Sequence, residues 1–344
     1  SGLASAGLMH AVYGRTFASL PIILNIVQLV GWGTFELVVM RDATVAIGQQ
    51  SGAMAGAHWP VLATLLWGGV VMLLISGSMV QLVRKLIARI ALPLVVLSLL
   101  WLSWQFLSLA QTQGFEALWT RKGDGGMGVL PALDLVIAMP ISWLPLVADY
   151  ARHGKNGGSA LRGTWLGYAL ANIWCYSLGV LVALTLPSQD LVQALLLAQG
   201  GLIALSLILI DEVDNAYGDA YSGAVSAHSL LPRWGVRAWG LLVAALCTGL
   251  ALVLPMHSLE PFLLLLSSVF VPLFGVILGR LAFGTDAPAL LAVARKVNAA
   301  PVAIWLAGIA VYHLAPKALP DAGSALPALV FSFVLAWATR PKAH

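Results

Sequence analysis

Four acidic residues lie inside an apolar segment that is long enough to cross a membrane. The segment LLLAQGGLIALSLILI runs directly into DEVDNAYGDAYSGAVSA, which contains Asp211, Glu212, Asp214 and Asp219. An ionised carboxylate in the hydrocarbon core costs roughly 2.5 kcal/mol or more, so such groups face a polar cavity or a partner. These side chains therefore indicate a site for a cation, a proton or a polar solute.

Helical periodicity divides these polar residues between two faces. Asp211, Asp214 and Asn215 share one face, and Glu212 with Asp219 forms a second face about 100° round the helix. We expect Asp211, Glu212 and Asp214 to line a cavity and to couple a cation, with Asp211 as a candidate Na⁺ ligand. Asp219 is expected nearer to water. The alternative is a helix end that has already left the membrane, with solvated acids.

A second polar stripe lies in the first apolar segment. Its members recur at spacings of three and four residues: Asn25, Gln28, Trp32 and Glu36. Trp32 stands between two glycines, which are expected to leave its indole face open. An aromatic ring with a hydrogen-bonding side chain one turn later suits a flat heterocycle, which needs a stacking surface and an edge partner. The alternative is a polar contact between two helices.

The segment DLVIAMPISWLPLVADYAR predicts an interrupted helix. Pro140 and Pro145 each remove a helical hydrogen bond. Backbone freed at membrane depth is tolerated only inside protein or beside a watery cavity, and transporters build binding sites from such breaks. Ser142 and Trp143 lie between the prolines and are candidates for this site. A proline kink without a ligand role is the alternative. Asp149, near the end of the segment, is expected in a charge pair at the cytoplasmic side.

Composition excludes an ordinary soluble protein. Hydrophobic residues make up 60% of the chain and charged residues only 9%, against about 25% charged residues in soluble domains. Two cysteines in separate apolar segments indicate neither a disulfide framework nor a metal site. The net charge of +4 comes from basic residues between the segments, so no nucleic-acid partner is expected. The chain begins at Ser1 without a signal-peptide pattern, which suggests a fragment.

Apolar stretches of about 20 residues predict ten membrane-spanning helices in a single transporter domain, 1–344. The expected spans are 17–40, 58–80, 88–110, 130–151, 163–186, 192–222, 236–256, 260–282, 299–315 and 323–339. Residues 1–16 are expected to be the tail of an earlier helix followed by a cytoplasmic turn. The connections between the spans are too short for a soluble domain.

The charges of the connections support this number of spans. With ten spans, fourteen of the eighteen lysines and arginines fall on the side of the N-terminus and four on the other side. Basic residues concentrate on the cytoplasmic side of a membrane. We therefore expect both termini in the cytoplasm, with the chain in the cell (inner) membrane.

Four segments resemble the nucleobase:cation symporter-1 family, the permeases for cytosine, purines, hydantoin, allantoin and thiamine precursors. They are YGRTFASLP, GWGTFE, SWLPLVADYARH and DEVDNAYGDAYSGAVSAHSL, and the last is the most specific. Within the family, the chain looks most like the proposed hydroxymethylpyrimidine transporters. The resemblance implies an all-α membrane protein of the LeuT type, with two inverted five-helix repeats and two further helices. The ten spans would then be helices three to twelve, and the first helix, which contributes to both family sites, would be missing.

The resemblance also implies roles for individual residues. The family stacks its substrate on an aromatic residue of helix three and bonds it with an amide one turn later; these positions are Trp32 and Glu36 here. The second stacking position falls on Pro140, with Trp143 one turn further on. Asn215 matches the N-x-Y of helix eight, whose neutral flanking positions are replaced by a group of acids: Asp211, Glu212 and Asp214.

Together these inferences predict a secondary active transporter that imports a pyrimidine-like heterocycle with Na⁺ or H⁺ by alternating access. No cofactor is expected beyond Na⁺ as a coupling ion, and the oligomeric state is left open. The expected substrate-binding residues are Trp32, Glu36, Gln28, Ser142, Trp143, Glu212, Asp214 and Asn215. The alternative is a membrane-embedded, metal-dependent enzyme such as a prenyltransferase, because Asp211–Asp214 forms a D-x-x-D. Such chemistry needs a second acidic cluster, and no other span has one.

Overall fold

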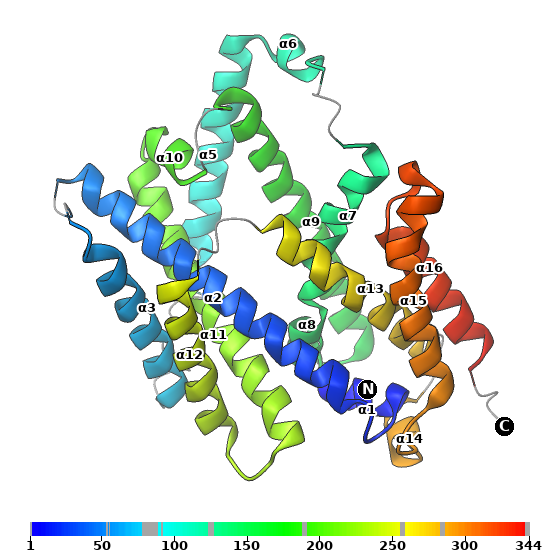
Figure 1. The fold of residues 1–344 in the computed structure, drawn as a ribbon. Coiled ribbons are helices and arrows are strands. Elements are labelled where there is room, and N and C mark those ends of the chain that lie inside the picture. The colour runs from blue at the N-terminus through cyan, green and yellow to red at the C-terminus, as the bar shows by residue number, and fades with distance from the viewer. Residues whose placement is uncertain are drawn as a thin grey trace.

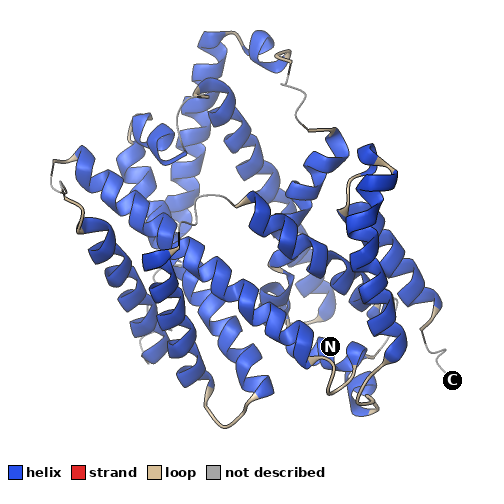
Figure 2. Ribbon diagram, viewed as in Figure 1, coloured by secondary structure: helices blue, strands red, loops and turns tan. Residues whose placement is uncertain are grey.

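The computed structural model describes residues 2–52, 54, 56–77, 89–90, 92–122, 127–187, 191–254, 259–282 and 286–340. Throughout these ranges the regular elements are helices, with no strand (Figure 2). The longer ones are α2 (Ser19–Gln50), α3 (Trp59–Ser76), α5 (Leu92–Gln113), α7 (Val129–Ser142), α8 (Leu144–Ala151), α9 (Gly157–Thr185), α11 (Gly201–Leu230), α12 (Val236–Val253), α13 (Glu260–Leu281), α15 (Ala299–Ala318) and α16 (Ala325–Ala338). The shorter ones are α1 (Ser5–Tyr13), α6 (Phe115–Trp119), α10 (Leu191–Leu197), α14 (Ala287–Ala292) and the 3₁₀ turn η2 (Pro320–Ala322).

The helices agree with the ten predicted spans. Among the described residues, eight segments are long and apolar enough to cross a membrane, with α7 and α8 counted together as Val129–Ala151. The other two spans correspond to α11, which contains the four acids, and to α16, an apolar helix of 14 residues. The chain is therefore an all-α, multi-pass membrane protein.

The predicted boundaries of two spans that bear on the site were wrong. Helix α2 continues ten residues past the predicted end at residue 40. The charge of Arg41 does not end the helix, because Arg41 pairs with Asp42 and donates a hydrogen bond to the carbonyl of Ala251 in α12. The predicted span 192–222 is divided into α10 and α11 at Gly200, which has a left-handed φ of 72°. The division places the acids in the middle of α11 rather than near its end.

Helix α5 holds the turn between α10 and α11. The carbonyl of Gln199 accepts hydrogen bonds from Trp101 Nε1 at 2.7 Å and from Gln105 Nε2 at 2.9 Å. The backbone groups that a helix break leaves unpaired need such partners. The position of α11, and hence of its acids, is fixed by this contact.

Helix α2 lies between two packed groups of helices (Figure 1). One face packs in a hydrophobic core shared with α3, α5, α11 and α12, and the other in a core shared with α1, α13 and α15. The most apolar parts of α2 and α13 are 61% and 72% buried, whereas that of α9 is only 11% buried. Polar residues of α2 therefore face protein, while α9 presents its apolar side chains to the lipid.

Two glycines bring α13 close to α16. A Cβ at Gly279 would clash with the carbonyl oxygen of Phe333, and one at Gly275 would lie 2.9 Å from Ser332 Cβ. Small residues four apart allow membrane helices to approach backbone to backbone. Helix α7 adds a cap to α16, because Asp134 accepts hydrogen bonds from the first amide groups of that helix.

Candidate substrate site

Trp32 lies at the centre of an aromatic cluster. Its ring centroid is 5.7 Å from that of Phe262 and 6.0 Å from those of Phe35 and Trp143. These are the distances of direct aromatic pairs, in tilted and edge-to-face arrangements. The sequence predicted an open indole face, which was wrong, because the Phe262 ring occupies the space where Gly31 has no Cβ. A heterocycle can stack on Trp32 only when one of these rings moves aside.

The break between α7 and α8 is bonded directly to the polar stripe of α2. Trp32 Nε1 donates to Ser142 Oγ at 3.1 Å, and Gln28 Nε2 donates to the Ser142 carbonyl at 2.8 Å. Pro140 lies inside α7, and Trp143 is the residue at which α7 ends and α8 begins. The structure therefore brings together four of the predicted substrate-binding residues: Gln28, Trp32, Ser142 and Trp143.

Gln28 and Glu36 are one helical turn before and one turn after Trp32. Both are buried, and one oxygen of each, Gln28 Oε1 and Glu36 Oε2, accepts no hydrogen bond from any described residue. A buried acceptor without a donor costs about 1–3 kcal/mol. Trp32 is therefore bracketed by two acceptors suited to a ligand that supplies N–H or O–H groups.

Glu36 also meets Asp219 from α11. The two carboxyl groups lie close enough to share a hydrogen bond, and both residues are almost fully buried, at 2% and 1% exposure. Gly33, one turn of α2 before Glu36, also faces this region: a Cβ there would lie 3.7 Å from Asp219 Cβ and 3.1 Å from Cys247 Sγ. The expectation that Asp219 lies nearer to water was wrong: it is the most buried of the four acids.

The other acids of α11 are half-buried, and Glu212 is the one that interacts with this pair. Asn215 Nδ2 donates to Glu212 Oε2 at 2.8 Å, and Glu212 interacts electrostatically with both Glu36 and Asp219. Asp211 and Asp214 interact with one another. Over the described part of the chain, no group of three or more histidines, cysteines or acids has the arrangement of a metal site.

Comparison with known proteins identifies the family. Residues 1–339 match the family described as "Permease for cytosine/purines, uracil, thiamine, allantoin". The chain belongs to this permease family. The match confirms the resemblance to the nucleobase:cation symporter-1 family, and it excludes the prenyltransferase alternative, since the permease is a secondary transporter and not an enzyme.

Solved structures of the transporter Mhp1 share the fold of the permease. One is Mhp1, a nucleobase-cation-symport-1 family transporter, in a closed conformation with bromovinylhydantoin bound; the TM-score is 0.73 at 16% identity, over 98% of this chain and 78% of that one. The inward-facing conformation of Mhp1 matches with a TM-score of 0.70 at 16% identity, over 97% and 75%. These matches confirm the LeuT-type fold. No curated protein sequence matches the permease.

Asp149 has a role that the sequence did not reveal. Its carboxylate accepts hydrogen bonds from the backbone amide of Ser5 at 2.8 Å and from Ser222 Oγ at 2.7 Å. Arg152, which lies close enough in sequence for a charge pair, donates instead to the Asp149 carbonyl. Asp149 thus ties α1, α8 and α11 together. The serine three residues after Asp219 was the only signal in the sequence, and its partner could not be identified without the fold.

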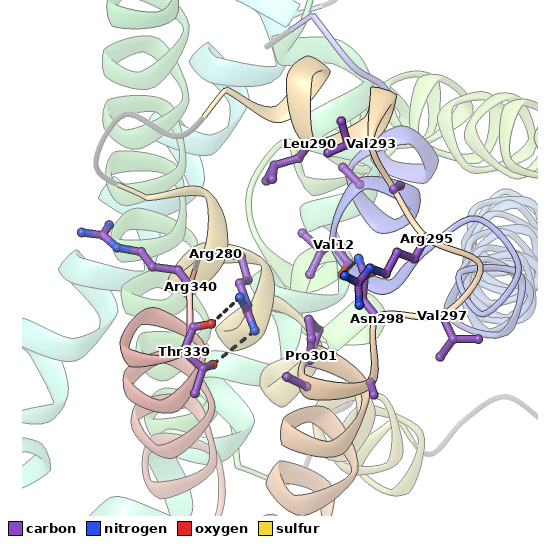
Figure 3. Close-up of a pocket in the computed structure, with 14 residues that line it drawn as sticks. Val12, Arg280, Leu290, Val293, Arg295, Val297, Asn298, Pro301, Thr339 and Arg340 are labelled. Carbon is purple, nitrogen blue, oxygen red and sulfur yellow. Dashed lines mark hydrogen bonds between the residues drawn. The ribbon is translucent and has the colours of Figure 1, made fainter. Parts of the chain in front are cut away.

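A separate pocket of about 510 Å³ lies between α1, α13, α14, α15 and α16 (Figure 3). Arg280 and Arg295 line it, and Arg280 donates two hydrogen bonds to Thr339, at 2.8 Å to the carbonyl and 3.2 Å to Oγ1. The pocket contains none of the residues around Trp32. We therefore place the candidate substrate site at Trp32 and not in this pocket.

Proposed function

We propose that the permease imports a planar, pyrimidine-like heterocycle, such as hydroxymethylpyrimidine, cytosine or a related nucleobase, together with Na⁺ or H⁺. Transport proceeds by alternating access across the cell membrane, with both termini of the chain in the cytoplasm. The observation that carries the substrate class is a set of buried acceptors, Gln28 Oε1 and Glu36 Oε2, one turn on either side of Trp32, that receive no hydrogen bond from an N–H or O–H group of the described residues.

This arrangement fits a flat ring with N–H groups on its edge. The ring stacks on Trp32, and its donors satisfy the free oxygens of Gln28 and Glu36. The hydantoin named in the Mhp1 complex is also a planar ring that carries N–H groups, which supports the same substrate chemistry for this chain.

The break between α7 and α8 supports a gating role for Trp143. Its indole contacts Trp32 and it occupies the junction between two short helices, where few backbone angles have to change for the ring to move. We propose that Trp143 swings away to admit the heterocycle and returns to cover it. Ser142 positions Trp32 through its hydroxyl group.

The half-buried acids are proposed to serve the cation. Asp211, Glu212 and Asp214 form an acidic approach along α11 towards the site, with Asn215 holding Glu212 in place. In the proposed topology α11 starts at the outer surface, so this approach leads inward from the outside.

Competition for uptake tests the substrate class. Cells that express the full-length permease are given labelled cytosine or hydroxymethylpyrimidine, with Na⁺ and pH varied separately. Unlabelled cytosine should compete at least about tenfold better than N4,N4-dimethylcytosine, which has the same ring but lacks the amino donor. Equal competition by the two compounds, or no uptake of any pyrimidine above that of control cells, would contradict the proposal.

A further inference from the structure

Glu36 on α2 and Asp219 on α11 are almost fully buried, and their carboxyl groups lie close enough to share a hydrogen bond. An ionised carboxylate can only accept hydrogen bonds, so a hydrogen bond between two carboxyl groups requires one of them to hold a proton. One oxygen of each carboxyl group, Glu36 Oε2 and Asp219 Oδ2, is buried and accepts no hydrogen bond from an N–H or O–H group of the described residues. When water is kept from them, two buried carboxyl groups this close must share a proton.

No described cation neutralises the pair. The titratable groups that face it are Glu212 from α11 and Cys247 from α12, and neither is basic. The described parts of α3, α5 and α10, which also pack against α2 or α11, contain no charged residue. Two carboxylates in contact repel one another, and without water or a cation they cannot both be ionised.

The neighbouring helices α1 and α8 do not change this balance. The carboxylate of Asp149 on α8 is already bound by Ser5 and Ser222. His10 on α1 interacts with the backbone of Gly14 and Arg15. Neither group acts on Glu36 or Asp219.

We propose that the coupling ion of the permease is a proton, and that the Glu36–Asp219 pair carries it. This inference rests on the proposed function, because Glu36 is also one of the acceptors that bracket Trp32. It assigns the coupling step to a residue, Asp219, that the sequence had not placed in the site.

The position of the pair explains how proton and heterocycle are linked. When the heterocycle binds beside Glu36 it displaces the water that would solvate a second negative charge. The pair must therefore take up a proton from the outer solution in the same event: hydronium gives up its proton, one carboxylate oxygen forms an O–H bond, and the other carboxylate accepts its hydrogen bond. After the site opens to the cytoplasm, water enters, the O–H bond breaks, and the proton leaves as hydronium.

Two measurements on the full-length permease in proteoliposomes test this inference. The first is equilibrium binding of labelled cytosine and hydroxymethylpyrimidine as a function of pH. In the alkaline range where the free pair loses its proton, the wild-type Kd should rise by about tenfold per pH unit, because binding takes up one proton. In Asp219→Asn, whose amide replaces the protonated acid, the Kd should not depend on pH.

The second measurement is uptake driven by a pH gradient with the membrane potential held at zero. An interior one pH unit more alkaline should drive about tenfold accumulation by wild type, for one proton per substrate. Asp219→Asn should exchange labelled for unlabelled heterocycle without accumulating it. Glu116→Gln, the same type of change at an exposed residue of α6, should accumulate substrate as wild type does.

The outcomes separate this inference from the function on which it rests. Accumulation driven by a Na⁺ gradient alone, a wild-type Kd that is independent of pH, or pH-driven accumulation by Asp219→Asn would overturn the proton assignment and leave the heterocycle permease standing. Failure of the wild type to bind or exchange either pyrimidine would overturn the proposed function itself, and the proton assignment with it.

Discussion

Trp32 Nε1 donates a hydrogen bond of 3.1 Å to Ser142 Oγ, and this contact joins the centre of α2 to the break between α7 and α8. The Ser142 hydroxyl donates in turn to the carbonyl of Met139 in α7. A tryptophan ring held at its nitrogen in this way keeps one orientation while neighbouring rings move. The relationship makes Trp32 the fixed part of the candidate site and Trp143 its movable part.

Replacing Trp32 should weaken substrate binding, whereas replacing an aromatic residue outside the site should not. Trp32→Ala removes the stacking surface, and the affinity for a pyrimidine should fall by about 1–3 kcal/mol, the scale of base–aromatic stacking. Trp119→Ala is the matched control, since Trp119 is 76% exposed on α6. Equal Kd values for Trp32→Ala and wild type, measured by equilibrium binding, would remove Trp32 from the site.

Removing the Ser142 hydroxyl should destabilise the fold around Trp32. In Ser142→Ala the buried indole nitrogen has no acceptor, which costs about 1–3 kcal/mol in the free energy of unfolding. Ser177→Ala provides the control, because the Ser177 hydroxyl is exposed and bonds only within its own helix. A loss of stability no larger than that of the control would show that the Trp32–Ser142 contact contributes little.

The Asp149 contact predicts a similar effect at the junction of α1, α8 and α11. Ser222→Ala removes a hydrogen bond to a buried carboxylate, and we expect a loss of about 1.5–3 kcal/mol in the free energy of unfolding. Ser206→Ala lies on the same helix but loses only a bond to the carbonyl of Leu202. Unfolding measured in the same detergent should separate the two variants; identical stabilities would contradict this role of Asp149.

The packing of α13 on α16 predicts intolerance to a single methyl group. Gly279→Ala places a Cβ against backbone atoms of α16 and should destabilise the permease by about 1–3 kcal/mol, as overpacking does. Gly69→Ala, in α3, has no atom within 4 Å of the new Cβ and should have no destabilising effect. If thermal unfolding shifted equally in both variants, the close approach of α13 and α16 would not be a source of stability.

Much of this arrangement could be predicted from the sequence, because helical periodicity determines which residues share a face of one helix. The spacing of Gln28, Trp32 and Glu36 predicted a polar stripe on α2, and two prolines predicted the break beside Ser142. The apolar stretches, together with the charges of the connections between them, predicted the number of spans. Contacts between distant helices could not be predicted in the same way: the Phe262 ring against Gly31 and the Ser222 bond to Asp149 depend on how the helices meet.

The error at Asp219 has a specific physical cause. An apolar run that included α10 placed the start of the helix at Val192, so Asp219 was counted near its end. The left-handed Gly200 ends that run, and α11 starts only at Gly201 and continues to Leu230. With the start corrected, Asp219 lies well inside the helix and faces Glu36.

The most direct test of the account is the structure of the full-length permease with a bound pyrimidine. We predict that the ring stacks on Trp32, that its N–H groups lie within hydrogen-bond distance of Gln28 Oε1 and Glu36 Oε2, and that Trp143 has moved to admit it. A pyrimidine bound elsewhere, for example in the pocket lined by Arg280 and Arg295, with the contacts around Trp32 unchanged, would contradict the central claim.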